Sequence, residues 1–187
     1  MISVFRYLRS IHPLSEALRD HLEDIIKEKR LSRKDHLVKA GQVCTNIYFI
    51  EKGLLRSYYT KGGREISSGF MKEGDVCTAV ESFLTQKHSQ EAIQALEDCI
   101  VYSISYEELQ HIYRDFSEFN GVGRKLLERC CLASVQRMTA MWMQKAKDRY
   151  TWLARHSSDL SQRVPAKYLA SYLGITEGML SKIKSKR

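Results

Sequence analysis

The spacing of apolar residues changes twice along the 187-residue chain, and each change predicts a different kind of structure. Residues 13–31 carry leucines and isoleucines at helical spacing with charges between them, which predicts an amphipathic helix capped by Ser15. From about residue 31 to 104, short apolar runs alternate with glycine-containing turns, a pattern typical of a small antiparallel barrel or roll. Helical spacing then returns and predicts a long helix over 122–147.

The roll prediction depends on the apolar runs and on the turns between them. The runs cover residues 47–50, 54–59, 66–70 and 100–104. The clearest turn is Lys61-Gly-Gly-Arg64, because paired glycines supply the positive φ angles of a tight hairpin. Glu81–Thr85 interrupts the strands as a short helix or loop, and Ser105 begins a capped helix.

The long helix carries an apolar stripe at a 3-4 spacing that is close to a heptad. The stripe consists of Leu127, Cys131, Ser134 or Val135, Met138, and Met141 or Trp142. A long helix with such a stripe often pairs with its own copy, so a homodimer is expected. The alternative is a core helix that lies across the roll.

Residues 163–184 predict two short helices joined by a tight break. Gly174 can take the left-handed conformation that ends one helix, and Thr176 can cap the next. Such a pair matches a helix-turn-helix that presents lysines on the outer side of its second helix, whereas an ordinary helical hairpin is the alternative. The inward faces are expected to hold Leu169, Ala170, Leu173, Met179, Leu180 and Ile183. A separate short helix over 149–156 precedes them.

Composition and charge narrow the function. Hydrophobic residues make up 43% of the chain and charged residues 28%, and no apolar run approaches the ~20 residues of a membrane span. The start lacks a signal-peptide core, so a cytoplasmic protein is expected. The net charge of +8 is uneven, because residues 1–119 hold 16 Lys and Arg against 18 Asp and Glu, whereas residues 120–187 hold 14 against 4. This asymmetry predicts a polyanion that is contacted by the C-terminal third.

The cysteines and histidines predict neither a metal centre nor catalysis. The five cysteines show no CxxC pair and no zinc spacing, and the six histidines lie mostly outside the strand runs. An enzyme built on a cupin-like roll would need clustered His and carboxylate ligands. We therefore expect no enzyme, no metal site, and reduced thiols that are mostly buried.

Three motifs occur in a fixed order: Ile47-Tyr-Phe-Ile-Glu-Lys-Gly53, Glu73-Gly-Asp75 and Ala170-Ser-Tyr-Leu-Gly-Ile-Thr176. Together they resemble the cyclic-AMP receptor protein and fumarate-nitrate regulator (Crp/Fnr) superfamily of bacterial transcription factors, over nearly the whole chain. The resemblance implies an α+β fold with an N-terminal antiparallel β-roll of the cyclic-nucleotide-binding, jelly-roll type, flanking helices, a long dimerisation helix and a small helix-turn-helix. The expected boundaries are 1–121, 122–147 and 148–187.

The resemblance also implies an effector pocket in the roll. Its expected residues are Thr78, Ala79, Glu81, Ser89 and Gln90, with Cys130 and Cys131 of the long helix facing them. Members that bind cyclic AMP have Gly-Glu and then Arg-Ser or Arg-Thr where this chain has Thr78-Ala79 and Ser89-Gln90. Because a buried cyclic phosphate needs a cationic partner, we expect no cyclic AMP, unless Lys87 or His88 replaces the arginine.

Other cofactors of the superfamily are judged from the cysteines. The iron–sulfur members use an N-terminal cysteine cluster, and no cysteine precedes Cys44, so no such cluster is expected. Haem is neither favoured nor excluded. Cys130 and Cys131 beside Arg129 suit either a redox sensor or two small residues packed at a helix interface.

The resemblance implies a DNA-reading surface as well. Its residues are Arg163, Lys167, Thr176, Glu177, Gly178, Ser181, Lys182, Lys184 and Lys186. Among them, Ser181 and Lys182 are expected at base edges, and the remaining basic residues at phosphates. Glu177 and Gly178 stand where members that read the well-known palindrome have Arg and Glu, so the operator is expected to differ.

These observations predict a homodimeric transcription regulator that reads a palindromic operator and is controlled by an unknown small-molecule effector in the roll. RNA polymerase would be a further partner of an activator, although no pattern marks a surface for it. The alternative is a cyclic-nucleotide or small-molecule sensor whose C-terminal tail docks a protein partner.

Overall fold

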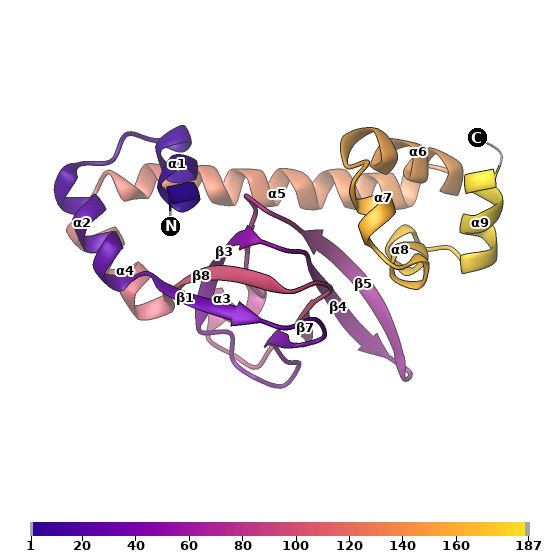
Figure 1. Ribbon diagram of the computed structural model, residues 1–187, viewed down its shortest axis with the longest axis horizontal. Helices are drawn as coiled ribbons and strands as arrows, with labels where there is room; N and C mark the ends of the chain where they lie inside the picture. The colour runs from indigo at the N-terminus through magenta and orange to yellow at the C-terminus, as the bar shows by residue number, and fades with distance from the viewer. Residues whose placement is uncertain (1, 186–187) are drawn as a thin grey trace.

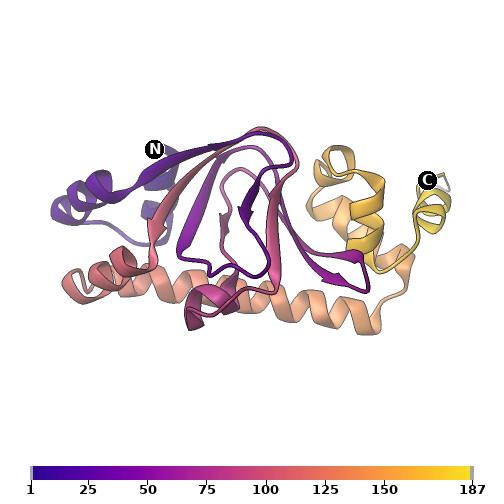
Figure 2. The same ribbon diagram turned by 90° about the horizontal axis from the view of Figure 1, so that it is seen from below.

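The computed structural model describes residues 2–185 and has its parts arranged along one long helix, α5 (Phe119–Met143) (Figure 1). The N-terminal helices lie at one end of α5, a β-roll lies in the middle and the C-terminal helices lie at the other end. The view from below shows the roll on one side of α5, with the C-terminal helices beside the far end of the roll (Figure 2). The predicted α+β fold is confirmed.

The roll consists of two four-stranded antiparallel sheets, with the strand orders β1-β8-β3-β6 and β2-β7-β4-β5. The strands are β1 (Lys27–Leu31), β2 (His36–Val38), β3 (Asn46–Lys52), β4 (Leu55–Lys61), β5 (Arg64–Met71), β6 (Val76–Cys77), β7 (Glu91–Ala95) and β8 (Cys99–Ser105). The predicted hairpin joins β4 to β5, and both of its glycines have positive φ, 57° at Gly62 and 73° at Gly63. Each of the four predicted apolar runs falls within or overlaps a strand.

The sequence prediction differs from the structure at the N-terminal end. The expected helix over 13–31 is α2 (Glu16–Ile25), with Ser15 as its cap, and the residues after it form β1. Ile26 leaves the helix at ψ 125°, and the polar residues that follow pair with β8 because their backbone completes that edge of the sheet. Helix α1 (Ile2–Ile11), which lies before the predicted helix, was not predicted.

One short helix lies between strands of the roll, and a second helix connects the roll to α5. Helix α3 (Val80–Thr85) is the predicted short interruption. Helix α4 (Tyr106–Asp115) begins with a full capping box, because Ser105 accepts from the Glu108 backbone N–H and the Glu108 carboxylate accepts from the Ser105 backbone N–H. The long helix then begins at Phe119 and ends at Met143, earlier at both ends than the predicted 122–147.

The C-terminal helices are α6 (Ala146–His156), α7 (Leu160–Arg163), α8 (Ala166–Leu173) and α9 (Glu177–Ser185). They share a hydrophobic core of their own, which includes Leu153, Leu169 and Leu180. Leu54 and Leu96 of the roll belong to the same core, so the C-terminal helices are docked on the roll. None of the described helices is both long and apolar enough to cross a membrane.

Candidate functional site

Helices α8 and α9 form the predicted helix-turn-helix. Gly174 ends α8 with φ 67°, and Thr176 accepts a hydrogen bond from the Met179 backbone N–H at 3.2 Å. Leu169, Ala170 and Leu173 of α8 are buried as predicted, and so is Leu180 of α9.

The outer face of α9 is exposed to solvent. Its exposed residues are Glu177, Gly178, Ser181, Lys182 and Lys184, with Thr176 just before them. A Cβ added at Gly178 would meet nothing within 4 Å, so that stretch of backbone is open to a large partner. Met179 was predicted to face inward, but its exposed fraction is 47%, which places it on the open face. Lys186 lies outside the described residues.

Arg163, predicted to contact phosphate, is bonded to the roll in this structure. Its guanidinium forms two-pronged hydrogen bonds with Glu97 (3.0 and 2.6 Å) and with Glu73 (2.9 Å for both bonds), and both carboxylates belong to the roll. These hydrogen bonds raise the pKa of Arg163 and, together with backbone N–H donors that include Gly53, lower the pKa of Glu73 to about 2. The prediction of a phosphate contact therefore does not suit this arrangement, because the planar guanidinium is already filled. Lys167 is exposed and remains a candidate.

Further polar contacts hold the helix-turn-helix on the roll. Lys72 bonds Asp159 at 2.7 Å, and the Ser67 backbone N–H donates to the Ser171 hydroxyl at 3.0 Å. The fully buried Arg56 of β4 lies 3.7 Å from the ring centroid of Tyr168 in α8 and bonds carboxylate and hydroxyl groups of β5. The docking is thus an interface of buried charge as well as of apolar contact.

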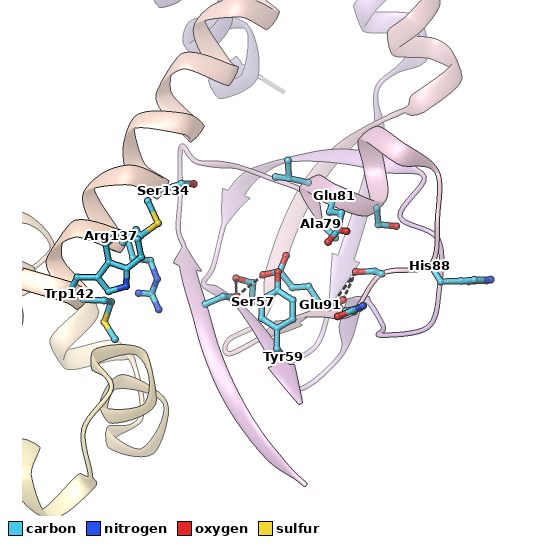
Figure 3. A pocket seen from close by; sticks show the side chains of 16 residues that line it. Ser57, Tyr59, Ala79, Glu81, His88, Glu91, Ser134, Arg137 and Trp142 are labelled. Carbon is cyan, nitrogen blue, oxygen red and sulfur yellow. Dashed lines mark hydrogen bonds between the residues drawn. The ribbon is translucent and has the colours of Figure 1, made fainter. Parts of the chain in front are cut away.

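A cavity of about 680 Å³ lies between the roll and the C-terminal half of α5 (Figure 3). The roll side presents Ser57, Tyr59, Glu81 and Glu91, and α5 presents Arg137 and Trp142 (Figure 3). A volume of this size suits a small-molecule ligand.

Four of the predicted pocket residues line this cavity, namely Ala79, Glu81, Ser89 and Gln90. Thr78 does not, because its hydroxyl donates to the Asn46 carbonyl at 2.9 Å inside the roll. Cys130 and Cys131 do not line it either and are exposed. The cavity instead meets α5 further along, from Ser134 onward.

Sequence reasoning predicted Glu81 but missed Glu91, Arg137 and the hydroxyl-bearing residues of β4 and β5 that line the cavity. Glu91 accepts a hydrogen bond from the Ser68 hydroxyl at 2.6 Å, and Ser68 is 2.8 Å from the Ser57 hydroxyl. Burial raises the pKa of Glu91, and burial together with the charges of Glu91 and Glu81 raises the pKa of Tyr59. The alternation of polar and apolar residues along β4 and β5 could have indicated the hydroxyl groups of the cavity, since Ser57, Tyr59 and Ser68 belong to those strands.

Arg137 is the guanidinium of the cavity wall, but its hydrogen bonds point elsewhere. Its Nη2 donates to the backbone carbonyls of Ser67 (3.2 Å) and Tyr172 (3.3 Å), and its guanidinium stacks 3.9 Å from the Tyr172 ring centroid. It therefore links α5 to both β5 and α8.

The cavity does not fit a cyclic phosphate. At the expected phosphate position, the Ser89 hydroxyl donates to the Glu91 carbonyl at 2.7 Å and accepts from the Glu91 N–H at 3.0 Å. The Glu91 carboxylate lies beside it, and Lys87 is not among the lining residues, although His88 is. The carboxylates of Glu81 and Glu91 on this side of the cavity would repel the phosphate's charge, and the guanidinium of the wall, Arg137, belongs to the opposite side on α5.

The cysteines of the described chain are free thiols, three buried and two exposed. Burial raises the pKa of Cys77 and of Cys99. Within residues 2–185 no group of three or more potential ligands is placed to hold a metal ion.

Helix α5 leaves much of its predicted dimer stripe in solvent. Leu127 is 54% exposed and Val135 is 47% exposed, and Cys131 lies on the same exposed side. Met138, Met141 and Trp142, which were predicted for the stripe, also line the cavity. The stripe and the cavity wall therefore share the C-terminal half of one helix.

A two-sheet roll, a cavity against a long helix and a docked helix-turn-helix together define a sensor roll joined to a nucleic-acid-binding module. Residues 28–116 match the family model of the cyclic nucleotide-binding domain. The fumarate and nitrate reduction regulatory protein of Vibrio cholerae is 26% identical over 183 residues, which cover 91% of this chain and 72% of that protein. The anaerobic regulatory protein of Aggregatibacter actinomycetemcomitans is 25% identical over 180 residues, 88% of this chain and 68% of that one.

Solved structures agree in fold. FixK2 from Bradyrhizobium japonicum superposes with a TM-score of 0.71 at 18% identity, covering 87% of this chain and 84% of that one. A chain from Eubacterium rectale assigned to the crp/fnr family gives a TM-score of 0.71 over 91% of this chain and 82% of that one, also at 18% identity. Residues 28–116 thus match a cyclic nucleotide-binding domain, and the chain is similar over most of its length to transcription regulators of the Crp/Fnr kind.

Proposed function

We propose that this DNA-binding transcription regulator works as a homodimer, in which each α9 enters the major groove of one half of a palindromic operator. The observation that carries the proposal is the exposed outer face of α9, which begins at a capped turn and presents Ser181 and Lys182; Lys184 is also exposed, with its Nζ 3.5 Å from the Ser161 carbonyl. Hydroxyl and ammonium groups on such a face suit base edges and phosphates. Lys167, at the start of α8, adds a further positive charge on an exposed side chain.

The proposed dimer is supported by the surface of α5. Exposed apolar side chains, among them Leu127, Leu132 and Val135, follow the helix outside the roll. A second copy of α5 would remove them from water and would place two copies of α9 about a two-fold axis. That symmetry requires a palindrome with half-sites about one helical turn apart.

The proposed effector site is the cavity between the roll and α5. Arg137 lines it and also bonds the carbonyl of Tyr172 in α8, so the cavity wall and the DNA-binding module are joined through one side chain. In the proposed mechanism, the C-terminal helices are either docked on the roll, as in this structure, or released from it. A ligand that binds one of these two states more tightly shifts the population toward that state.

A salt titration of DNA binding tests the first part of the proposal. Each phosphate contact contributes about 0.9 to the slope of log K against log salt, so Lys184→Ala is expected to flatten the slope by about that amount. Lys125→Ala is the matched control, because Lys125 pairs with Glu128 on α5, remote from α9, and its loss should leave the slope unchanged. Binding that does not depend on salt, or no binding to any DNA, would contradict the proposal.

Sedimentation tests the dimer. Val135→Glu places a charge in the exposed apolar stripe and is expected to shift the protein toward monomer. Gln136→Glu is the control, because it lies one position further around the helix, outside the stripe. Equal sedimentation of both variants as dimers would show that α5 does not form the interface.

A further inference from the structure

The cavity has a distribution of charge that selects one class of ligand. On the roll side, Glu91 accepts a hydrogen bond from the Ser68 hydroxyl, which Ser57 contacts in turn, and within residues 2–185 Glu91 forms no salt bridge. Glu81 lines the same side, and its charge is felt at Tyr59 together with that of Glu91. The roll side is therefore acidic and lined with hydroxyl groups.

The opposite wall differs in character. Met138, Met141 and Trp142 of α5 give it an apolar surface with one large aromatic ring. Arg137 lies on this wall, but its Nη2 is committed to the Ser67 and Tyr172 carbonyls, away from the carboxylates. A ligand that spans the cavity thus meets carboxylates at one end and apolar side chains at the other.

Partial burial of the Glu91 carboxylate costs solvation free energy when no ligand is bound. A half-buried carboxylate that has only hydroxyl partners gains much from a cation that brings its own N–H donors. An ammonium group supplies three donors in a compact volume, whereas a phosphate would add a second negative charge beside Glu91. The acidic side therefore selects for positive charge and against the anion that this domain type is named for.

We propose that the cavity binds an organic cation, an amine carried on an apolar body, with its ammonium at Glu91 and Glu81 and its body against Met138, Met141 and Trp142. This deepens the effector-binding part of the proposed function and rests on it only in placing the effector in this cavity. The ammonium group would bind non-covalently, so binding would be reversible.

Three probes with one indole body and different charges test the proposal on the full chain without DNA. At pH 7, tryptamine is a cation, tryptophol is neutral and indole-3-acetate is an anion. Titration calorimetry is expected to give the affinity order tryptamine, tryptophol, indole-3-acetate, with at least about a 10-fold step from the alcohol to the amine. The carboxylates of the cavity account for the difference in affinity between tryptophol and tryptamine, because the indole ring is the same in both probes.

Variants assign the effect to the two carboxylates. Glu91→Gln keeps an acceptor for Ser68 and is expected to lower tryptamine affinity by about 5- to 10-fold, as is Glu81→Gln, while tryptophol affinity stays unchanged. Glu107→Gln on the exposed face of α4 is the matched control and should change none of the three. Met138→Ala should weaken all three probes alike.

Three results would contradict the proposal that the cavity binds an organic cation. Indole-3-acetate binding as tightly as tryptamine, an unchanged amine-to-alcohol ratio in Glu91→Gln, or no tryptamine binding up to about 10 mM would each overturn the proposal. The ratio is measured within one variant, so a partly unfolded preparation does not imitate the effect. Because DNA is absent, failure here leaves the DNA-binding proposal untouched, and failure of the salt titration leaves this one untouched.

Discussion

Replacing Arg163 with glutamine should loosen the helix-turn-helix from the roll. The guanidinium makes paired hydrogen bonds to Glu97 and to Glu73, and all four distances lie between 2.6 and 3.0 Å. Side-chain exposure is 26% for Arg163, 41% for Glu73 and 36% for Glu97, so water screens the pairs in part. Well-formed pairs of this kind contribute up to about 1 kcal/mol each, which gives about 1–2 kcal/mol for the two.

The pKa of Glu73 gives a second measure of the same contact. The hydrogen bonds from Arg163, together with backbone N–H donors that include Gly53, lower that pKa from 4.5 to about 2. Taken at face value the difference is about 3.4 kcal/mol, and screening of a carboxylate with this exposure reduces it to about 1–2 kcal/mol. After screening, the pKa difference is therefore of the same order as the contribution of the two ion pairs.

The sign of the pH dependence follows from the direction of the change. A carboxylate whose pKa is lowered by folding contributes stability that is present above about pH 4.5 and is lost as the pH falls toward 2. Arg163→Gln should therefore cost about 1–2 kcal/mol of unfolding free energy at pH 7 and less at pH 3. Arg163→Lys should recover less than half of the loss, because an ammonium cannot form the paired bonds.

Urea unfolding followed by tryptophan fluorescence measures the effect, since the two tryptophans, Trp142 and Trp152, lie in α5 and α6. Arg155→Gln, an exposed arginine on α6, is the matched control and should stay within about 0.5 kcal/mol of the wild-type value. A cost for Arg163→Gln below about 0.3 kcal/mol, or an equal cost at pH 7 and pH 3, would refute the reasoning. An unchanged slope in the salt titration of Arg163→Gln would show in addition that the arginine does not contact phosphate.

Two further predictions follow from single positions. Gly174→Ala should cost about 1 kcal/mol or more in thermal unfolding, because φ is 67° and a Cβ would lie 2.8 Å from the Met141 methyl group, whereas Gly178→Ala should stabilise by about 0.5–1 kcal/mol, because nothing lies within 4 Å. Equal changes in thermal stability for Gly174→Ala and Gly178→Ala would contradict the assignment of Gly174 to the turn between α8 and α9. A thiol reagent should label Cys130 in the folded protein, label Cys131 faster in Val135→Glu than in the wild type because the proposed dimer covers it, and reach the three buried cysteines only on unfolding, with mass spectrometry reading each site.

Local chemistry made the turns and caps predictable. The β4–β5 hairpin, the Ser105 capping box and the Gly174 break each depend on a few adjacent residues whose preferences are strong. The four unpredicted strands depend on partners remote in sequence. β1 exposes four of its five residues, and β6 is two residues long, so neither has an apolar pattern to detect, and each forms because a neighbouring edge accepts its backbone.

The candidate cavity was predictable only on its roll side. Ala79, Glu81, Ser89 and Gln90 follow from the position of the roll motifs, since the strands fix their spacing. The helix side depends on the angle at which α5 crosses the sheets, which no local pattern encodes. Cys130 and Cys131 were therefore predicted to face the cavity although they precede its wall, which begins on α5 at Ser134.

The two arginines show why charge alone misleads about function. Arg137 and Arg163 both belong to the basic C-terminal third, so the sequence favours a polyanion partner for each. In the folded chain Arg163 bonds carboxylates of the roll, and Arg137 bonds carbonyls of β5 and α8 while it lines the cavity. Both arginines tie the DNA-binding module to the sensor roll, and a module tied in this way must give up those bonds before it can move. Under the proposed mechanism, an effector bound in the cavity would supply the free energy of that release through its different contacts in the two arrangements.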